Sequence, residues 1–191
     1  RRHLDLNGTP VANPTSVGQG SYLYSKVIGP GCTSTGTLVI TKDVPDFTAR
    51  ITINPSTISG PSTVNVIIDV IEILDKASCD DVYVLVPVFG ERYSFTYNSN
   101  LGQLGIFTIS NSHWQYLGSN GAFHIWKYIG PPLGSPTFPV GGFSRFGFSG
   151  TYNNQGTSGE TRFTVEVVQG SGGEINFMNN ADGETLFYRR N

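Results

Sequence analysis

Charged residues are scarce in this chain of 191 residues. Asp, Glu, Lys and Arg make up 14% of the sequence, against roughly 25% in an average globular protein. The formal net charge is −2, whereas nucleic-acid-binding proteins normally carry a basic patch or stripe. Arginines stand near both ends of the chain, where solvated tails are the simplest interpretation. We therefore expect no strong nucleic-acid-binding surface.

Cysteine and histidine are also rare, with two and three residues. Cys32 and Cys79 permit at most one disulfide bond, and each follows a turn-like stretch. A loop-to-loop bridge and two free thiols both stay open as alternatives. His3, His113 and His124 do not stand at a metal-binding spacing from one another or from a cysteine. The sequence thus predicts no metal site and no cofactor.

Long apolar runs and familiar catalytic motifs are also missing. No apolar run approaches the ~18 residues of a membrane-spanning helix, and neither a Gly-x-Ser-x-Gly elbow nor a phosphate-binding glycine loop occurs. The candidate carboxylate pairs for a glycosidase are Asp69 with Glu72 and Glu160 with Glu166. Only the second pair shares a strand face, and Arg162 lies between its members, as in an exposed charge ladder. We expect no catalytic residues and a protein that is not an enzyme.

Short segments rich in β-branched and aromatic residues, separated by turn residues, run through the whole chain. The strongest are 63–74, 81–89 and 161–169. Further candidate strands are 21–28, 37–41, 47–53, 93–97, 104–110, 114–117, 122–128, 145–152, 174–177 and 185–189. No window of comparable length has a helical period. This pattern predicts an all-β sandwich or barrel of about a dozen short strands.

Two of these segments also indicate which side chains face inward. In 47–53 every second residue is apolar, which is typical of a strand with one buried and one solvated face. In 63–74 both faces carry valine and isoleucine. A strand of that kind is central in its sheet or is covered by another subunit, although periodicity alone does not exclude a helix there.

Glycine and proline set the expected domain organisation. Residues 1–20 lack a periodic pattern and are interpreted as an extended N-terminal arm, with residues 21–191 forming a single β-sandwich domain. Four prolines in 130–142 predict a long, stiff loop, and ordered loops on β scaffolds often carry contacts. Ala181-Asp182-Gly183 is a hairpin-turn signal.

Four aromatic residues are the candidate ligand or interface side chains. Trp114 and Tyr116 are two residues apart on one predicted strand, as are Trp126 and Tyr128 on the next, so each pair shares a face. An exposed aromatic platform would suit a sugar ring or a protein partner. The alternative is that these rings pack in the sandwich core or in a subunit interface.

The segment 161–180 (TRFTVEVVQGSGGEINFMNN) resembles the last strands of the small capsid protein of comoviruses and their picorna-like plant relatives. In that family a strand, a short turn and a second strand end the jelly roll. The resemblance implies an antiparallel jelly-roll β-sandwich that tiles an icosahedral shell and has no catalytic residues. The trimeric head of a viral fibre fits the same outline.

The leading functional hypothesis is therefore a virion structural protein, most simply a single jelly-roll capsid subunit that acts by self-assembly. Its expected partners are other capsid subunits, identical or sister chains, and a host receptor or glycan. Its expected interfaces are the strand near 67–73, the proline loop 131–139 and the arms at both termini. The alternative is a secreted or surface carbohydrate-binding β-sandwich, located outside the cell, that uses Trp114, Tyr116 and Trp126.

Overall fold

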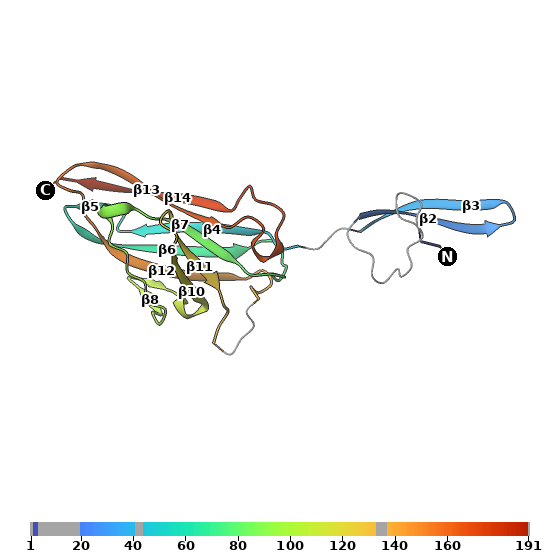
Figure 1. The fold of residues 1–191 in the computed structure, drawn as a ribbon, viewed down its shortest axis with the longest axis horizontal. Coiled ribbons are helices and arrows are strands. Elements are labelled where there is room, and N and C mark those ends of the chain that lie inside the picture. The colour runs from blue at the N-terminus through green and yellow to red at the C-terminus, as the bar shows by residue number, and fades with distance from the viewer. Residues whose placement is uncertain (1, 4–19, 41–43, 133–136, 191) are drawn as a thin grey trace. The chain divides into compact units, whose positions relative to one another are not determined.

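The computed structural model describes residues 2–3, 20–40, 44–132 and 137–190 (Figure 1). The chain divides into two compact units, residues 1–43 and 44–191. In the first unit β2 (Gly20–Gly29) and β3 (Cys32–Ile40) form an antiparallel hairpin, and β1 (Arg2–His3) pairs with β2. Most of the expected arm 1–20 lies outside the described residues. The expected boundary after residue 20 differs from this division, which groups the β2–β3 hairpin with the N-terminal residues.

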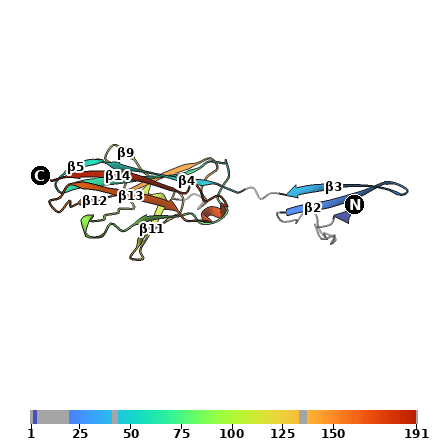
Figure 2. The ribbon, with the colours of Figure 1, turned by 90° about the horizontal axis from the view of Figure 1, so that it is seen from above.

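The second unit is a sandwich of two β-sheets (Figures 1 and 2). Its main strands are β4 (Phe47–Asn54), β5 (Thr57–Ser59), β6 (Ser62–Glu72), β7 (Tyr83–Pro87), β10 (Trp114–Ser119), β11 (Phe123–Tyr128), β12 (Phe143–Tyr152), β13 (Gly159–Val167) and β14 (Ala181–Arg189). A small hairpin is formed by β8 (Gln103–Leu104) and β9 (Phe107–Thr108), and the 3-10 turns are η2 (Gly90–Arg92), η3 (Asn111–His113) and η4 (Ser171–Gly173). The predicted all-β sandwich is confirmed.

The two sheets have the orders β10-β11-β7-β13-β14-β5 and β12-β6-β4. The chain passes from one sheet to the other between β6 and β7, between β11 and β12 and between β12 and β13, whereas the hairpins β10–β11 and β13–β14 each stay within the six-stranded sheet. In this arrangement β6 pairs with β12, while β7 pairs with β11 and β13. Between β7 and β10, the predicted strand 93–97 adds to the β12 edge through two isolated bridges, Tyr93 to Tyr152 and Thr96 to Ser149. Pairing within the two sheets is antiparallel except between β14 and β5, which are parallel.

The face predictions for β4 and β6 are confirmed. In β4, Phe47 and each second residue after it are buried, and the residues between them are more exposed. Strand β6 is central, between β12 and β4. Its outward-facing Ile67 is buried in a small cluster with Leu104 and Ile109. The expectation that Ile67 contributes to a subunit interface is therefore wrong, because the chain covers this side chain itself.

Two local predictions near the C-terminus are wrong. Residues 174–177 are not a strand, and 181–183 are not a hairpin turn, since Asp182 and Gly183 lie inside β14 opposite Val165 and Thr164. The chain turns earlier, where Gly170, Gly172 and Gly173 of the η4 region have positive φ. After that turn, the buried side chain of Glu174 bonds to the backbone of β4, which fixes the segment as a loop.

Two further features bear on the expected class of protein. Within the described residues, no helix has both the length and the apolar character needed to cross a lipid bilayer. Cys32 and Cys79 are both free and exposed, which selects the free-thiol alternative.

Candidate functional site

The predicted aromatic platform is mostly part of the core. Trp114 and Tyr128 are opposite each other on β10 and β11, as are Tyr116 and Trp126. Three of the four are buried, with Trp126 at 0% exposure, and only Tyr116 is half-buried. Trp126 stacks on Phe148 of β12, with ring centroids 5.4 Å apart. The shared face identified from the sequence thus points into the sandwich. Of the two alternatives left open by the sequence, an exposed platform and packing in the core, the structure shows packing in the core for Trp114, Trp126 and Tyr128.

A buried asparagine holds the 3-10 turn η3 against β12. The Asn111 side-chain amide donates to the carbonyl oxygens of Asn98 and Gly147, at 2.8 Å each. Its Oδ1 accepts the N–H of Gly147, also at 2.8 Å. One side chain therefore continues the hydrogen bonding along the β12 edge, beyond the two backbone bridges. Sequence reasoning missed this residue, because an asparagine before a predicted strand is an ordinary turn signal.

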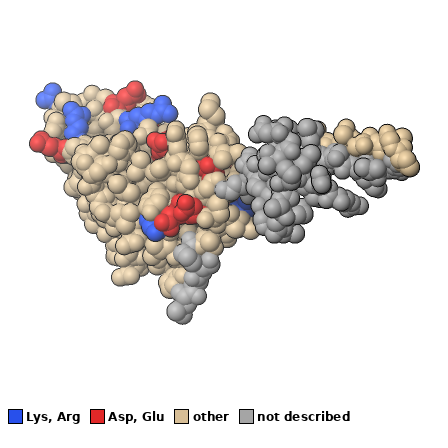
Figure 3. Space-filling model, turned by 45° about the vertical axis from the view of Figure 1, so that its right-hand side comes forward, with Lys and Arg blue, Asp and Glu red and all other residues tan. Residues whose placement is uncertain are grey.

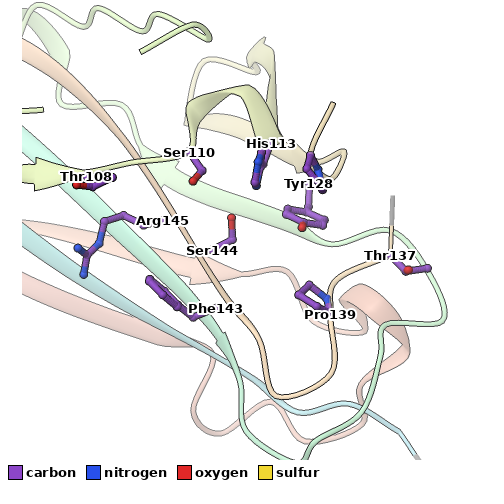
Figure 4. Close-up of a pocket in the computed structure, with 10 residues that line it drawn as sticks. Thr108, Ser110, His113, Tyr128, Thr137, Pro139, Phe143, Ser144 and Arg145 are labelled. Atoms are coloured by element: carbon purple, nitrogen blue, oxygen red, sulfur yellow. The ribbon is translucent and has the colours of Figure 1, made fainter. Parts of the chain in front are cut away.

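The position of η3 creates a cavity of about 480 Å³ beside the start of β12 (Figure 4). Its lining comprises Thr108, Ser110, His113, Tyr128, Pro131, Thr137, Pro139, Phe143, Ser144 and Arg145. Two prolines of the predicted contact loop are among them, whereas residues 133–136 of that loop lie outside the described residues. Of the four predicted aromatics, only Tyr128 reaches this cavity.

Among the described residues of the cavity wall, Arg145 is the one with a permanent charge, and that charge is paired. Its Nε and Nη2 donate to Oδ1 and Oδ2 of Asp69 at 2.6 and 2.9 Å. The guanidinium also lies 5.7 Å from the ring centre of Phe107 and 5.6 Å from that of Phe143. The hydrogen bonds to Asp69 raise the pKa of Arg145, and burial lowers the pKa of His113. The cavity therefore favours an uncharged occupant, since its cation is already paired.

The candidate carboxylates do not come together as a catalytic pair. Asp69 is bonded to Arg145, while Glu72 is buried and bonded to backbone N–H groups. Glu160 and Arg162 are exposed on β13, as a charge ladder would be. No group of three or more His, Cys, Asp or Glu in the described parts of the chain is arranged to hold a metal ion.

Exposed apolar side chains gather at one end of the sandwich. They are Ile73, Leu74, Val140, Phe143, Ile175, Phe177 and Met178, each exposed by 42% or more. We call this set the apolar end. It comes from the loop after β6, the lead-in to β12 and the loop before β14. Scattered surface leucines and phenylalanines are normal, but exposed apolar side chains on loops that are hydrogen-bonded to one another are typical of an interaction surface.

Two acidic residues bind these loops to one another. The Glu72 carboxylate accepts the N–H groups of Leu74, Lys76 and Gly141 at 3.0, 2.9 and 3.0 Å, and that of Asp46 at 3.3 Å. Burial alone would raise the pKa of Glu72, but the four backbone donors together outweigh it and lower the pKa. The Asp46 carboxylate in turn accepts bonds from two asparagine side chains of the loop before β14. The apolar end therefore rests on a fixed backbone.

Glu174 completes this set of contacts from the opposite sheet. Its Oε2 accepts the N–H of Phe47 at 3.0 Å, and its Oε1 accepts the side-chain amide of Asn180. Burial raises the pKa of Glu174, and the nearby charge of Asp46 adds to that increase. Glu72 and Glu174 thus have pKa values displaced in opposite directions at the same end of the sandwich.

Comparisons with known proteins give little beyond the fold. No family model and no curated protein sequence matches the chain. One matching solved structure is titled "AvmM Catalyzes Macrocyclization in Alchivemycin A Biosynthesis", at 10% identity, covering 76% of this chain and 89% of that one, with a TM-score of 0.42. Because a protein described as a catalyst is among the matches, we withdraw the prediction that the chain is not an enzyme. A likeness at this level supports no particular activity here.

Proposed function

We propose that this chain is a structural protein of a virion, a jelly-roll subunit that acts by self-assembly. The observation that carries the proposal is the apolar end, with Met178 exposed by 94% and Phe143 by 60%. Leaving such side chains in water is unfavourable by roughly 25 cal/mol per Å² of apolar area. In a self-assembling protein, a second copy of the chain covers these apolar side chains.

The low charge of the surface agrees with this role. The cores of protein interfaces are depleted in charged residues and enriched in aromatic residues and methionine. In the view of Figure 3, Lys, Arg, Asp and Glu occupy small separate areas, and most of the described surface belongs to other residues. Three acidic groups at the apolar end, Asp46, Glu72 and Glu174, are buried, whereas Asp75, next to Leu74, is exposed.

The first unit gives a separate argument for self-assembly, which does not depend on the apolar end. Among the described residues β3 pairs with β2 only, so one edge of β3 has no partner strand. Natural edge strands are usually protected by charge, proline or a bulge, but β3 (CTSTGTLVI) contains neither a charged residue nor proline. A hairpin of two strands is also marginally stable by itself. Pairing of β3 with a strand of another copy would cover its open edge and would add a strand that stabilises the hairpin.

Sedimentation velocity tests the proposal on the intact chain. We expect the wild type to sediment as an assembly heavier than the 20.7 kDa chain. The double variant Phe143→Ser with Phe177→Ser should weaken assembly by at least about tenfold, since each change removes on the order of 1 kcal/mol or more of apolar burial. Thermal unfolding checks that the variant is folded.

The matched control is Phe187→Ser with Leu117→Ser, at positions exposed by 49% and 47% outside the apolar end. This control should assemble as the wild type does. A monomeric wild type, or equal loss in both double variants, would contradict the proposal.

A further inference from the structure

A second depression lies beside the same 3-10 turn, against β10. It is an open groove of about 690 Å³ with walls from the loop after Tyr97, from η3 and from β10. Trp114 and Tyr116 line it, so this groove uses part of the aromatic set predicted from the sequence. None of the described residues that line it is charged.

The aromatic wall of the groove is rigid. The Tyr97 hydroxyl is 3.0 Å from the carbonyl oxygen of Asn111 and 2.9 Å from that of Trp114. The Tyr116 hydroxyl is 2.8 Å from Nδ1 of His124. The two tyrosine rings lie 5.8 Å apart at 51°. Both hydroxyls are thus already bonded within the protein, and the rings present fixed apolar faces and edges.

The polar wall differs from the aromatic wall, because its side chains are exposed and their polar groups are not already bonded within the described part of the chain. Ser99, Asn100, Ser112 and Gln115 line the groove and are exposed. Their side chains make no hydrogen bond to any other residue that the structure describes. Two primary amides and two hydroxyls therefore remain uncommitted, and together they offer both donors and acceptors. Fixed rings beside free neutral polar groups form a site that is prepared for a ligand.

From this combination we propose that the groove binds a neutral saccharide. Hydroxyl groups on adjacent carbons of a sugar match the paired donor and acceptor of an Asn or Gln amide. The C–H faces of a sugar pack on tyrosine rings, which combine apolar area with a polar edge. An anionic sugar would find no cation among the described residues of the groove wall to neutralise it. The inference is independent of self-assembly, because the groove and the apolar end share no residue.

Saturation-transfer NMR tests the proposal on the full chain with weakly binding probes. The neutral probes are lactose, maltotriose, mannotriose and chitotriose at millimolar concentration, and sialyllactose is the anionic comparison. At least one neutral probe should show saturation transfer that exceeds that of sialyllactose. Asn100→Ala and Gln115→Ala should each weaken its binding by about three- to tenfold, the effect of losing one or two hydrogen bonds.

Gln169→Ala is the matched control, because Gln169 is exposed and does not line the groove. It should bind as the wild type does. The proposal is overturned if no neutral probe binds, if sialyllactose binds best, or if Gln169→Ala weakens binding as much as Gln115→Ala. These outcomes leave the sedimentation result unaffected, so failure of either proposal can be recognised separately.

Discussion

Asp69 and Arg145 are register partners on neighbouring strands, 76 positions apart in the sequence. They face each other across the β6–β12 ladder, and both guanidinium bonds reach the carboxylate, at 2.6 and 2.9 Å. Their side chains are 12% and 29% exposed. This bidentate pair fixes Arg145 between Phe107 and Phe143, and so sets one wall of the cavity.

The first prediction concerns this ion pair. Asp69→Asn should lower the free energy of unfolding by about 1–3 kcal/mol, because a part-buried guanidinium loses its charged partner. Urea denaturation measures the change. Arg50 is the control, since it also faces Asp69 across a register but is exposed. Arg50→Gln should change stability by less than about 0.5 kcal/mol, and an equal cost for both variants would show that the bidentate geometry is unimportant.

The second prediction concerns pH and the two buried glutamates. The pKa of Glu72 is lowered from its ordinary value of 4.5, so the unfolded chain binds its proton more readily, and stability falls as pH decreases below about 4.5. The pKa of Glu174 is raised from 4.5, so the native state binds its proton more readily, and stability falls as pH increases above 4.5 through the raised pKa.

Substitutions separate these opposite effects in urea titrations between pH 3 and pH 7. Glu174→Gln should flatten the decline above pH 4.5. Glu72→Gln should cost about 1–3 kcal/mol at pH 7, because an amide cannot accept four N–H bonds, and should flatten the decline at acid pH. Glu160→Gln, at an exposed position on β13, controls for the substitution itself. If neither Glu72→Gln nor Glu174→Gln changes how the free energy of unfolding depends on pH, the opposite pKa shifts of the two glutamates are refuted.

The third prediction concerns a close backbone approach. A Cβ added at Gly150 would lie 1.7 Å from the carbonyl oxygen of Ser94 and 2.8 Å from the Tyr93 ring. Gly150→Ala must therefore displace the 93–96 segment from β12, at a cost of about 1–3 kcal/mol or more. Hydrogen exchange at the Thr96 amide, which donates to Ser149, should become faster. Gly102→Ala, where a Cβ would meet open space, should leave that exchange unchanged.

Local patterns were sufficient to predict much of the fold. The apolar alternation beginning at Phe47 and the two-faced apolar composition of β6 follow from the two-residue period of a strand, which depends on neighbours in sequence alone. The same period predicted a strand at 174–177, and this prediction was wrong. The buried contacts of Glu174 with Phe47 and Asn180 hold the segment as a loop. The contact with Phe47 joins residues 127 positions apart, so no local pattern reports it.

The candidate site was harder to predict for the same reason. The spacing of Trp114, Tyr116, Trp126 and Tyr128 correctly indicated a shared strand face, but spacing does not say whether that face meets water or the other sheet. Asn111 had no sequence signal beyond that of an ordinary turn residue, since its role depends on the neighbouring backbone of Gly147.

By itself, the sequence determined that this protein is built of many short strands with few charges, because β-branched and aromatic residues at period two admit little else. Only the tertiary structure decided which faces are buried, which loops meet at the apolar end and which polar side chains remain free in the groove. These outcomes depend on strand register and sheet order, which arise from pairings between distant segments such as β6 with β12 and β7 with β13.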